Sequence, residues 1–387
     1  MIEPRPFQIC SRCILDTKDY PEIIFDEQGV CNICHTFDDL KRRTVFSGEE
    51  GKLKLELLQA ELQNSRKNNI YDCVLAVSGG ADSLYLAHLC KAWGLNPIVL
   101  HIDNGWNSEL SVKNIENVIR HLGFDLYTYV IDWQELRDLQ LAYFKAGVVD
   151  LDIPSENALM AAFYLTAKKF KVKHILTGHN TMTEGWLPPN FVSQYKLDTR
   201  NLRAIQKQFG TIKLKKYPSI GFVRHFYNSR IKGIKFINPL NLIDYRKEEA
   251  KKLLEKDYGW RDYGSKHFEN IFTRFYQGYI LPVKFGVDKR KSHYSTLICS
   301  GQMKREEALE LVKHPPYHDQ QLMEEDQRFL LKKLGMSEDD FAVFMKQPIR
   351  SHDDFPSYLH LYRSLRPVIK LVRKFVPSGS QKDKSNK

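Results

Sequence analysis

One short segment constrains the fold of this chain more than any other: an apolar run that leads directly into a glycine-rich turn. Residues 71–77 have the composition of a buried strand, and Ser-Gly-Gly-Ala-Asp-Ser follows at 78–83. Residues 84–90 then show a helical pattern that Gly94 ends. A helix that begins at a glycine turn presents free backbone N–H groups and the positive end of its dipole at one point. The segment therefore predicts an α/β fold with an anion-binding site at this turn.

The turn differs from the two commonest nucleotide-binding motifs. It lacks the lysine of the Walker phosphate loop, and its glycines do not have the G-x-G-x-x-G spacing. It instead resembles the signature of the PP-loop ATP pyrophosphatases, which cleave ATP between the α and β phosphates. The alternative is a glycine turn that binds no ligand. The residues that the resemblance assigns to ATP are Ser78, Gly79, Gly80, Asp82 and Ser83, with Asp82 also organising Mg²⁺.

Further apolar runs fit a nucleotide-binding α/β unit. They predict strands at 96–102, 126–131 and 174–177, and helices at 108–122 and 155–170. The predicted fold class is a Rossmann-like parallel sheet of the adenine nucleotide alpha hydrolase or PP-loop type. A small zinc-binding module precedes the sheet, and a mainly helical region follows it.

Several polar residues follow the predicted strands, where ligands of open parallel sheets lie. Asp103 ends the second strand and is expected near the adenosine, although it also suits a helix cap, a role that Ser108 suits better. Gly178 and His179 follow the last strand and resemble a Gly-His pair that lies close to the phosphates in PP-loop enzymes. Glu184 is expected to complete a Mg²⁺ site with Asp82, with simple surface solvation as the alternative.

The first four of the seven cysteines form two C-x2-C pairs: Cys10, Cys13, Cys31 and Cys34. This spacing predicts a tetrathiolate zinc site, and four thiolates leave no open coordination position, so the zinc is structural. An iron–sulfur cluster, four metal-free buried thiols and a ligand role for the neighbouring His35 are the alternatives. The other three cysteines are isolated in the sequence, and Cys73 and Cys90 fall in core patterns.

The second half of the chain has blocks of basic and aromatic residues. Residues 185–235 lack clean periodicity, and Arg200 within them is a candidate substrate-binding residue. Lys266 and His267 are further candidates for substrate binding, and Lys289, Arg290 and His293 for catalysis through charge stabilisation. A plain basic surface is the alternative. Ser300 or Gly301 is expected to start a helix that continues over 305–313.

Composition and charge limit the classes of ligand and the cellular location that we expect. Lys and Arg outnumber Asp and Glu by 58 to 47, for a net charge of +11, which suits either polyanionic ligands or a solubilising surface. No apolar run approaches a membrane span and no secretory signal is visible, so a cytoplasmic protein without a transmembrane segment is expected. The predicted divisions are 1–50 (zinc module), 51–69 (helical linker), 70–245 (ATP-binding domain with a substrate insertion), 246–377 (helical substrate or partner region) and 378–387 (disordered tail).

Taken together, these motifs resemble the N-acetyl sugar amidotransferase family, the WbpG/PseA-like proteins of bacterial surface-polysaccharide synthesis. The resemblance spans about residues 10–310, and Ser265 departs from it where Gly is expected. Its motifs are Cys-Ser-Arg-Cys-Ile-Leu-Asp-Thr, Gly-Val-Cys-Asn-Ile-Cys, Ser-Gly-Gly-Ala-Asp-Ser, Gly-His-Asn with Thr-Glu-Gly, Tyr-Gly-Ser-Lys-His, Phe-Gly-Val-Asp-Lys-Arg and Ser-Gly-Gln-Met.

The resemblance implies an ATP-dependent conversion of an acetamido group to an acetamidino group on a nucleotide-activated diacetamido uronic acid or a similar sugar. AMP transfer to the amide oxygen releases pyrophosphate, and ammonia then displaces AMP. No cysteine of the chain lies in a glutaminase pattern. A separate glutaminase subunit is therefore expected. The resemblance implies that this subunit is HisH-like and that a HisF-like subunit accompanies it, and no nucleic acid is expected.

Two rival functions remain open at this stage. A PP-loop tRNA-modifying enzyme, either a thiolase or a lysidine-type ligase, fits the zinc knuckle and the positive charge. The scattered Cys73, Cys90 and Cys299 count against a thiolase, which needs paired cysteines near the phosphate loop. A non-catalytic nucleotide-binding scaffold is the second rival, and its function would survive Asp82→Ala.

Overall fold

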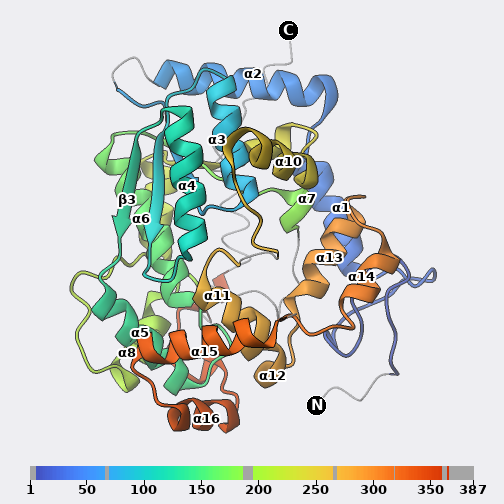
Figure 1. The fold of residues 1–387 in the computed structure, drawn as a ribbon, viewed down its shortest axis with the longest axis vertical. Coiled ribbons are helices and arrows are strands. Elements are labelled where there is room, and N and C mark those ends of the chain that lie inside the picture. Colours follow the sequence, from blue (N-terminus) through green and yellow to red (C-terminus); the bar gives the residue numbers. More distant parts are fainter. Residues whose placement is uncertain are drawn as a thin grey trace.

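The computed structural model of the chain describes residues 6–65, 69–185, 195–264, 268–317, 319–359 and 364–365. Its centre is a five-stranded parallel sheet with the order β3-β2-β1-β4-β5 (Figure 1). In register, Val74 of β1 lies beside Ile98 of β2 and Ile175 of β4. The sheet confirms the predicted fold class. The strands are β1 (Val74–Val77), β2 (Ile98–Asp103), β3 (Leu126–Val130), β4 (His174–Leu176) and β5 (Lys235–Ile237).

Alternating side chains of the strands enter two different cores. Leu75, Val99 and Leu176 pack against α3 (Ala81–Ala92), α4 (Glu109–Leu122) and α10 (Lys247–Tyr258) on one face. Val74, Ile98 and Ile175 pack against α6 (Ile153–Lys169) on the other. Because both faces of the sheet are covered, β1, β2 and β4 are largely apolar, which is why they were recognisable in the sequence.

A second helical layer lies beyond the carboxyl edge of the sheet (Figure 1). Its core contains Trp106 from the loop after β2, Phe144, Phe272 and Phe344, with the rings of Phe144 and Phe344 4.7 Å apart. The layer confirms the predicted helical C-terminal region. Its helices are α5 (Trp133–Ala146), α8 (Thr199–Phe209), α11 (Ile271–Phe275), a π-helical turn (Tyr276–Ile280), α12 (Leu281–Phe285), α15 (Gln320–Leu334) and α16 (Glu338–Lys346).

The N-terminal module packs against two helices from late in the sequence, as Figure 1 shows for α1 and α13. The helix expected from Ser300 or Gly301 instead begins at Arg305, because Ser300 ends α13 and Gly301 has a left-handed φ of 75°. The elements here are α1 (Asn32–Thr44), α2 (Gly48–Ser65), α7 (Thr181–Glu184), α13 (Lys289–Cys299) and α14 (Arg305–Leu311). Short elements elsewhere are α9 (Phe222–Phe226), a π-helical turn (Tyr227–Ile231) and 3-10 helices at Pro239–Leu242 and His352–Asp354.

Within the described ranges, none of the helices has both the length and the apolar character that a membrane span requires. The predicted residues Lys266 and His267, and the predicted tail from 378, lie outside the described residues.

Candidate active site at the phosphate loop

The glycine turn after β1 forms the phosphate loop and starts α3. Gly80 is the N-cap residue of α3, and Gly79 has a φ of 90° that favours glycine. The Ser83 hydroxyl donates to the Gly80 carbonyl (3.1 Å) and accepts from the Ser78 N–H (3.2 Å), which closes the turn. The first N–H groups of α3 therefore face one point, as an anion site requires.

Gly178, at the end of β4, packs directly on the first turn of α3. A Cβ at this position would lie 2.6 Å from the Ser83 nitrogen and 2.8 Å from the Asp82 carbonyl carbon. Only glycine fits this approach, since the contacts are with backbone that cannot move aside. The structure therefore places the predicted Gly178 against the phosphate loop.

Asp82, in the first turn of α3, is held by a tyrosine that was not selected from the sequence. The hydroxyl of buried Tyr245 donates to Oδ1 of Asp82. Burial, followed by the charges of Asp82 and Glu184, raises the pKa of Tyr245. Glu184 in turn is bound to Nδ1 of His179. The charges of Asp82 and Glu184 thus both act on Tyr245, and His179 is bound to Glu184. Carboxylates are the side chains that Mg²⁺ prefers as ligands.

Asp103 lies at the carboxyl end of β2 and accepts a hydrogen bond from the Gly105 N–H (2.7 Å). The cap of α4 is Ser108, whose hydroxyl accepts from the Ser111 N–H, so the side chain of Asp103 is not used as a helix cap. Lys333 approaches from α15 and binds the Gly105 carbonyl. Burial lowers the pKa of Lys333, and the nearby Asp103 opposes that change.

The predicted catalytic residues Lys289, Arg290 and His293 all lie on α13 but differ from one another in what surrounds them. The Arg290 guanidinium pairs with Asp288 (2.7 Å) and donates to the carbonyls of Leu311 and His314, so it ties α13 to the end of α14. The charge of Lys289, beside it, acts on the carboxyl groups of Asp150 and Asp152. His293 lies one turn further along α13.

Arg200 lies on α8 in the helical layer. Its guanidinium stacks on the ring of Tyr358, 5.4 Å from the ring centroid. Asp198, two residues before it, caps α8 by accepting from the N–H groups of Arg200 and Asn201.

Three carboxylates at the start of α6 were not selected from the sequence. Burial raises the pKa of Asp150 to about 6 and that of Asp152 to about 7, and Glu156 adds to both shifts while Lys289 and Lys196 oppose them. Lys196 pairs with Glu156 at 2.9 Å. α6 precedes β4 and runs antiparallel to it, so these groups lie at the carboxyl edge of the sheet. They could not be selected from the sequence because acidic residues before a helix are common and because their burial depends on segments that are distant in the sequence.

The four N-terminal cysteines converge as predicted. All four sulfur atoms lie within 4.8 Å of one another, with Cys10–Cys34 at 3.9 Å, Cys13–Cys31 at 3.7 Å and Cys31–Cys34 at 3.6 Å. Ligands about 2.3 Å from a tetrahedral Zn²⁺ lie roughly 3.8 Å apart, so the sulfur set fits one such ion. Cysteines 73 and 90 are buried in the core, as expected.

The sequence suggested that Cys299 is isolated, but its sulfur lies 3.5 Å from that of Cys34. It comes from the end of α13, which packs on the knuckle formed by residues 10–34. Two further contacts join them: Lys291 binds Asp16 at 2.8 Å, and the Ile14 N–H donates to Ser295. Arg305 of α14 also donates to the carbonyls of Cys10 and Cys13.

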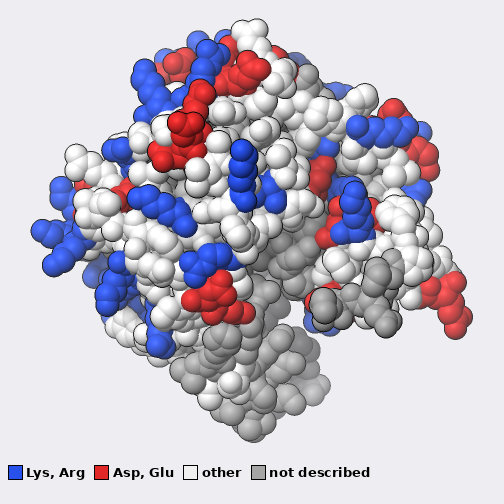
Figure 2. All heavy atoms as spheres, turned by 90° about the horizontal axis from the view of Figure 1, so that it is seen from below, with Lys and Arg blue, Asp and Glu red and all other residues white. Residues whose placement is uncertain are grey.

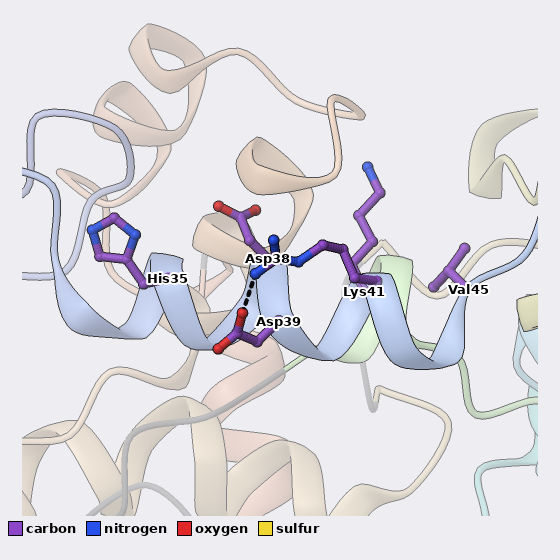
Figure 3. A pocket seen from close by; sticks show the side chains of 6 residues that line it. His35, Asp38, Asp39, Lys41 and Val45 are labelled. Carbon is purple, nitrogen blue, oxygen red and sulfur yellow. Dashed lines mark hydrogen bonds and ion pairs between the residues drawn. The ribbon is translucent and has the colours of Figure 1, made fainter.

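His35 lies apart from the four sulfurs and binds Asp26 at 2.8 Å. It lines a shallow hollow of about 650 Å³ on α1 together with Asp38, Asp39, Lys41, Arg42 and Val45 (Figure 3). None of the predicted site residues lines this hollow. On the face drawn in Figure 2, basic and acidic side chains are interspersed rather than gathered into one basic stripe.

The sheet order and the loop together define an α/β protein with a parallel sheet and a glycine-rich phosphate loop after its first strand. Residues 269–366 match the family described as "LPS biosynthesis protein WbpG-like, C-terminal domain". The chain therefore carries a WbpG-like C-terminal domain, which confirms the resemblance inferred from its motifs.

Two curated proteins are similar to parts of the chain. An uncharacterized protein of Methanocaldococcus jannaschii is 26% identical over 174 residues, which cover 44% of this chain and 58% of that protein. A tRNA(Ile)-lysidine synthase of Chlamydia pneumoniae is 39% identical over 71 residues, 17% of this chain and 22% of that protein. The match thus spans little more than half of the first relative and about a fifth of the second.

Among solved structures, the NMN synthetase of Francisella tularensis aligns with 75% of this chain and 98% of its own, at 14% identity and a TM-score of 0.38.

Proposed function

We propose that this chain is an ATP-dependent amidotransferase. It converts an acetamido group of a nucleotide-activated sugar, such as a UDP-diacetamido uronic acid, to an acetamidino group during synthesis of a bacterial surface glycan such as an O-antigen. The observation that carries the proposal is the presence, in one chain, of a phosphate loop after β1 and a WbpG-like domain over 269–366. A cytoplasmic location follows from the proposed nucleotide-sugar substrate.

The chemistry explains why ATP is needed. An amide carbonyl is a poor electrophile and its oxygen is a poor leaving group. The amide oxygen attacks the α phosphorus, the bond to the bridging oxygen breaks, and pyrophosphate leaves. Ammonia then attacks the carbon of the imidate, whose nitrogen has kept its proton, the C–O bond breaks, and AMP leaves with its oxygen. One ammonia proton is released to AMP or water, so the product is an amidinium with a new NH2 group. Positioning and charge stabilisation supply the rate, without a covalent nucleophile on the protein.

The residues around the loop have proposed roles in this scheme. The loop residues Ser78, Gly79, Gly80 and Ser83 hold pyrophosphate. Asp82 and Glu184 would hold Mg²⁺, which supplies positive charge to the phosphates, and His179 supports Glu184. Asp103 contacts the adenosine side.

The basic residues of α13 and of the segments that precede it are assigned to binding of the sugar and to stabilising the charge that develops on the phosphates. Lys289 and His293 face substrate or phosphate, and Arg290 keeps α13 in place through its pairing with Asp288 and two carbonyls. Arg200, Lys266 and His267 contact the sugar.

The ammonia source is proposed to be a separate HisH-like glutaminase subunit, accompanied by a HisF-like subunit. The positions of the seven cysteines support this division. Four form the metal knuckle, Cys299 adjoins it, and Cys73 and Cys90 are buried in the sheet core. No thiol is therefore placed as a glutaminase nucleophile.

The test is a turnover assay with the purified chain, ATP, Mg²⁺, ammonium and a panel of UDP-diacetamido sugars. AMP and pyrophosphate should form with one sugar, and the product should be lighter by the difference between O and NH. Glutamine should replace ammonium only after a glutaminase subunit is added. Turnover with glutamine alone would contradict the separate subunit, and AMP formation without any change in sugar mass would contradict amidine synthesis.

One observation favours a second candidate, a lysidine-type tRNA ligase: the 39% identity over 71 residues with a tRNA(Ile)-lysidine synthase. AMP formation that requires tRNA and falls steeply with salt would establish this function in place of the sugar reaction.

A further inference from the structure

The carbonyl of Gly79, at the centre of the phosphate loop, accepts two hydrogen bonds from a segment far along the chain. Trp260 Nε1 donates to it at 2.9 Å, and the Tyr263 hydroxyl donates to it at 2.7 Å. Trp260 is only 2% exposed. Both residues follow α10, so they reach the loop from outside the strand–turn–helix unit that forms it.

The hydroxyl of Tyr263 has a fixed direction. Asn114, on α4, accepts from the Arg261 N–H through Oδ1 (3.0 Å), which assigns its Nδ2 as the donor to Tyr263 (2.9 Å). Because the hydroxyl accepts from Asn114, its single proton is directed to Gly79. Burial raises the pKa of Tyr263, so this proton is retained at neutral pH. Asn114 is itself 1% exposed and also donates to the Arg261 carbonyl.

The two bonds determine where the next N–H group points. In a trans peptide the C=O and the following N–H lie on opposite sides, so holding the Gly79 carbonyl against Trp260 and Tyr263 directs the Gly80 N–H the other way. That N–H makes one long contact, 3.4 Å to the Ser78 hydroxyl, which an anion oxygen can replace. A Cβ at Gly79 would lie 2.9 Å from the Tyr263 oxygen, so the contact also requires glycine there.

We propose that Trp260 and Tyr263, supported by Asn114, are positioning residues that hold the Gly79–Gly80 peptide in the orientation that binds the β and γ phosphates of ATP. The inference deepens the proposed function and rests on it for the identity of the nucleotide. It assigns a role in ATP binding to a segment of the chain that immediately precedes the proposed sugar-binding residues Lys266 and His267.

The test measures binding of α,β-methylene-ATP and of AMP to the full chain with Mg²⁺ by calorimetry. Tyr263→Phe removes one oxygen and should raise the Kd of the triphosphate analogue roughly tenfold, as expected for a lost hydrogen bond of a buried group. Trp260→Phe should act in the same direction. The Kd of AMP, which lacks the β and γ phosphates, should change less than twofold in both variants.

The matched control is Tyr258→Phe, which removes a hydroxyl bonded to His88 (2.6 Å) on the same helix α3, two turns beyond the loop. It should leave both Kd values unchanged. An unchanged analogue Kd in Tyr263→Phe and Trp260→Phe would overturn the positioning role, as would an equal loss for AMP and the analogue. Failure of the unaltered chain to bind the analogue would instead remove the proposed function itself.

Discussion

Asp82 is the residue on which the proposed ATP site depends most. It begins α3, and the buried hydroxyl of Tyr245 holds its carboxylate in place. We expect Asp82→Asn to reduce AMP formation by about 100-fold or more, because the amide keeps the shape of the side chain and loses the charge that Mg²⁺ needs. The measurement is AMP release as a function of Mg²⁺ concentration.

Asp39→Asn is the control for that variant, since Asp39 is a surface carboxylate paired with Arg42 on α1. It should leave the rate unchanged. A scaffold protein would show no loss of function in either variant.

Asp152 gives a prediction about pH. Its pKa of about 7 is above that of an unfolded aspartate, so the native state binds a proton that the unfolded chain has already released. Stability therefore falls as the pH rises from about 4 to 7. Asp152→Asn removes this cost and should stabilise the chain by roughly 2 kcal/mol at pH 8 and by little at pH 4.5.

Urea unfolding at the two pH values measures this difference. Equal effects of Asp152→Asn at both would show that burial does not disfavour the charged form of Asp152.

At the scale of single residues, a motif of adjacent residues was more informative than isolated ones. The glycine turn and the cysteine pairs carry their geometry in their spacing, so they were predicted from the sequence. Tyr245 and Trp260 bind partners 163 and 181 positions away, and the residues around them form no pattern. Two of the charges that act on Asp150, those of Lys196 and Lys289, also come from distant segments. Arg290 was selected as a charged residue, and only the structure shows that its guanidinium binds Asp288 and two carbonyls.

Among the secondary-structure elements, α13 depends on the metal knuckle. It is joined to residues 10–34 through Lys291, Ser295 and Cys299, and Arg305 of α14 adds two bonds. We expect Cys31→Ser to abolish metal binding and to speed amide exchange in α13, because the knuckle derives most of its folding free energy from the ion. Exchange in β1 and β2 should change much less.

Metal analysis and hydrogen-exchange mass spectrometry test this expectation. Cys299→Ser is the matched control and should retain one ion per chain. Faster exchange throughout the sheet in Cys31→Ser would contradict a local role for the knuckle.

Secondary-structure elements were predicted from the sequence where one face of the element, or the whole element, is buried. The strands β1, β2 and β4 are continuous apolar runs, and α4 has a clear apolar face. α5 was missed because Glu135, Asp138 and Gln140 are buried within it and interrupt its apolar pattern. Glu135 accepts from the N–H groups of residues 215–217, and Asp138 binds Thr211, which no local rule predicts. α8 and β5 were missed for the same reason. They lie in a basic segment, and the residues they pack against are distant in the sequence.

At the scale of the whole molecule, two cores extend across residue 246, where the sequence suggested a division. Leu254 and Trp260 share a core with β1, and Phe272 and Phe344 share one with α5. We expect a chain ending at residue 245 to be insoluble or to lack a cooperative thermal transition, because these apolar surfaces would be exposed. Near-ultraviolet circular dichroism on heating measures this, and a sharp transition would show that 70–245 folds alone.

The helical layer also contains a buried ion pair. Arg274 on α11 binds Asp326 on α15 through two nitrogens, and Tyr317 donates to the same carboxylate. Arg274→Met should reduce the free energy of unfolding by about 3–5 kcal/mol, because it leaves Asp326 buried without its partner. Arg120→Met, which breaks an exposed pair with Glu116, should cost less than about 0.5 kcal/mol by the same urea titration.

The docking of the knuckle on α13 has a consequence for synthesis of the chain. About 260 residues separate Cys34 from Lys291. At about 5–20 residues per second, the ribosome completes the docking partner roughly 10–50 s after the last cysteine ligand has been added. During that interval the nascent knuckle has its apolar side and four thiols exposed, so capture of the metal ion must come before tertiary packing. The yield of native protein should then depend on how much free metal the cell holds while translation is under way, even if the mature chain releases its ion slowly.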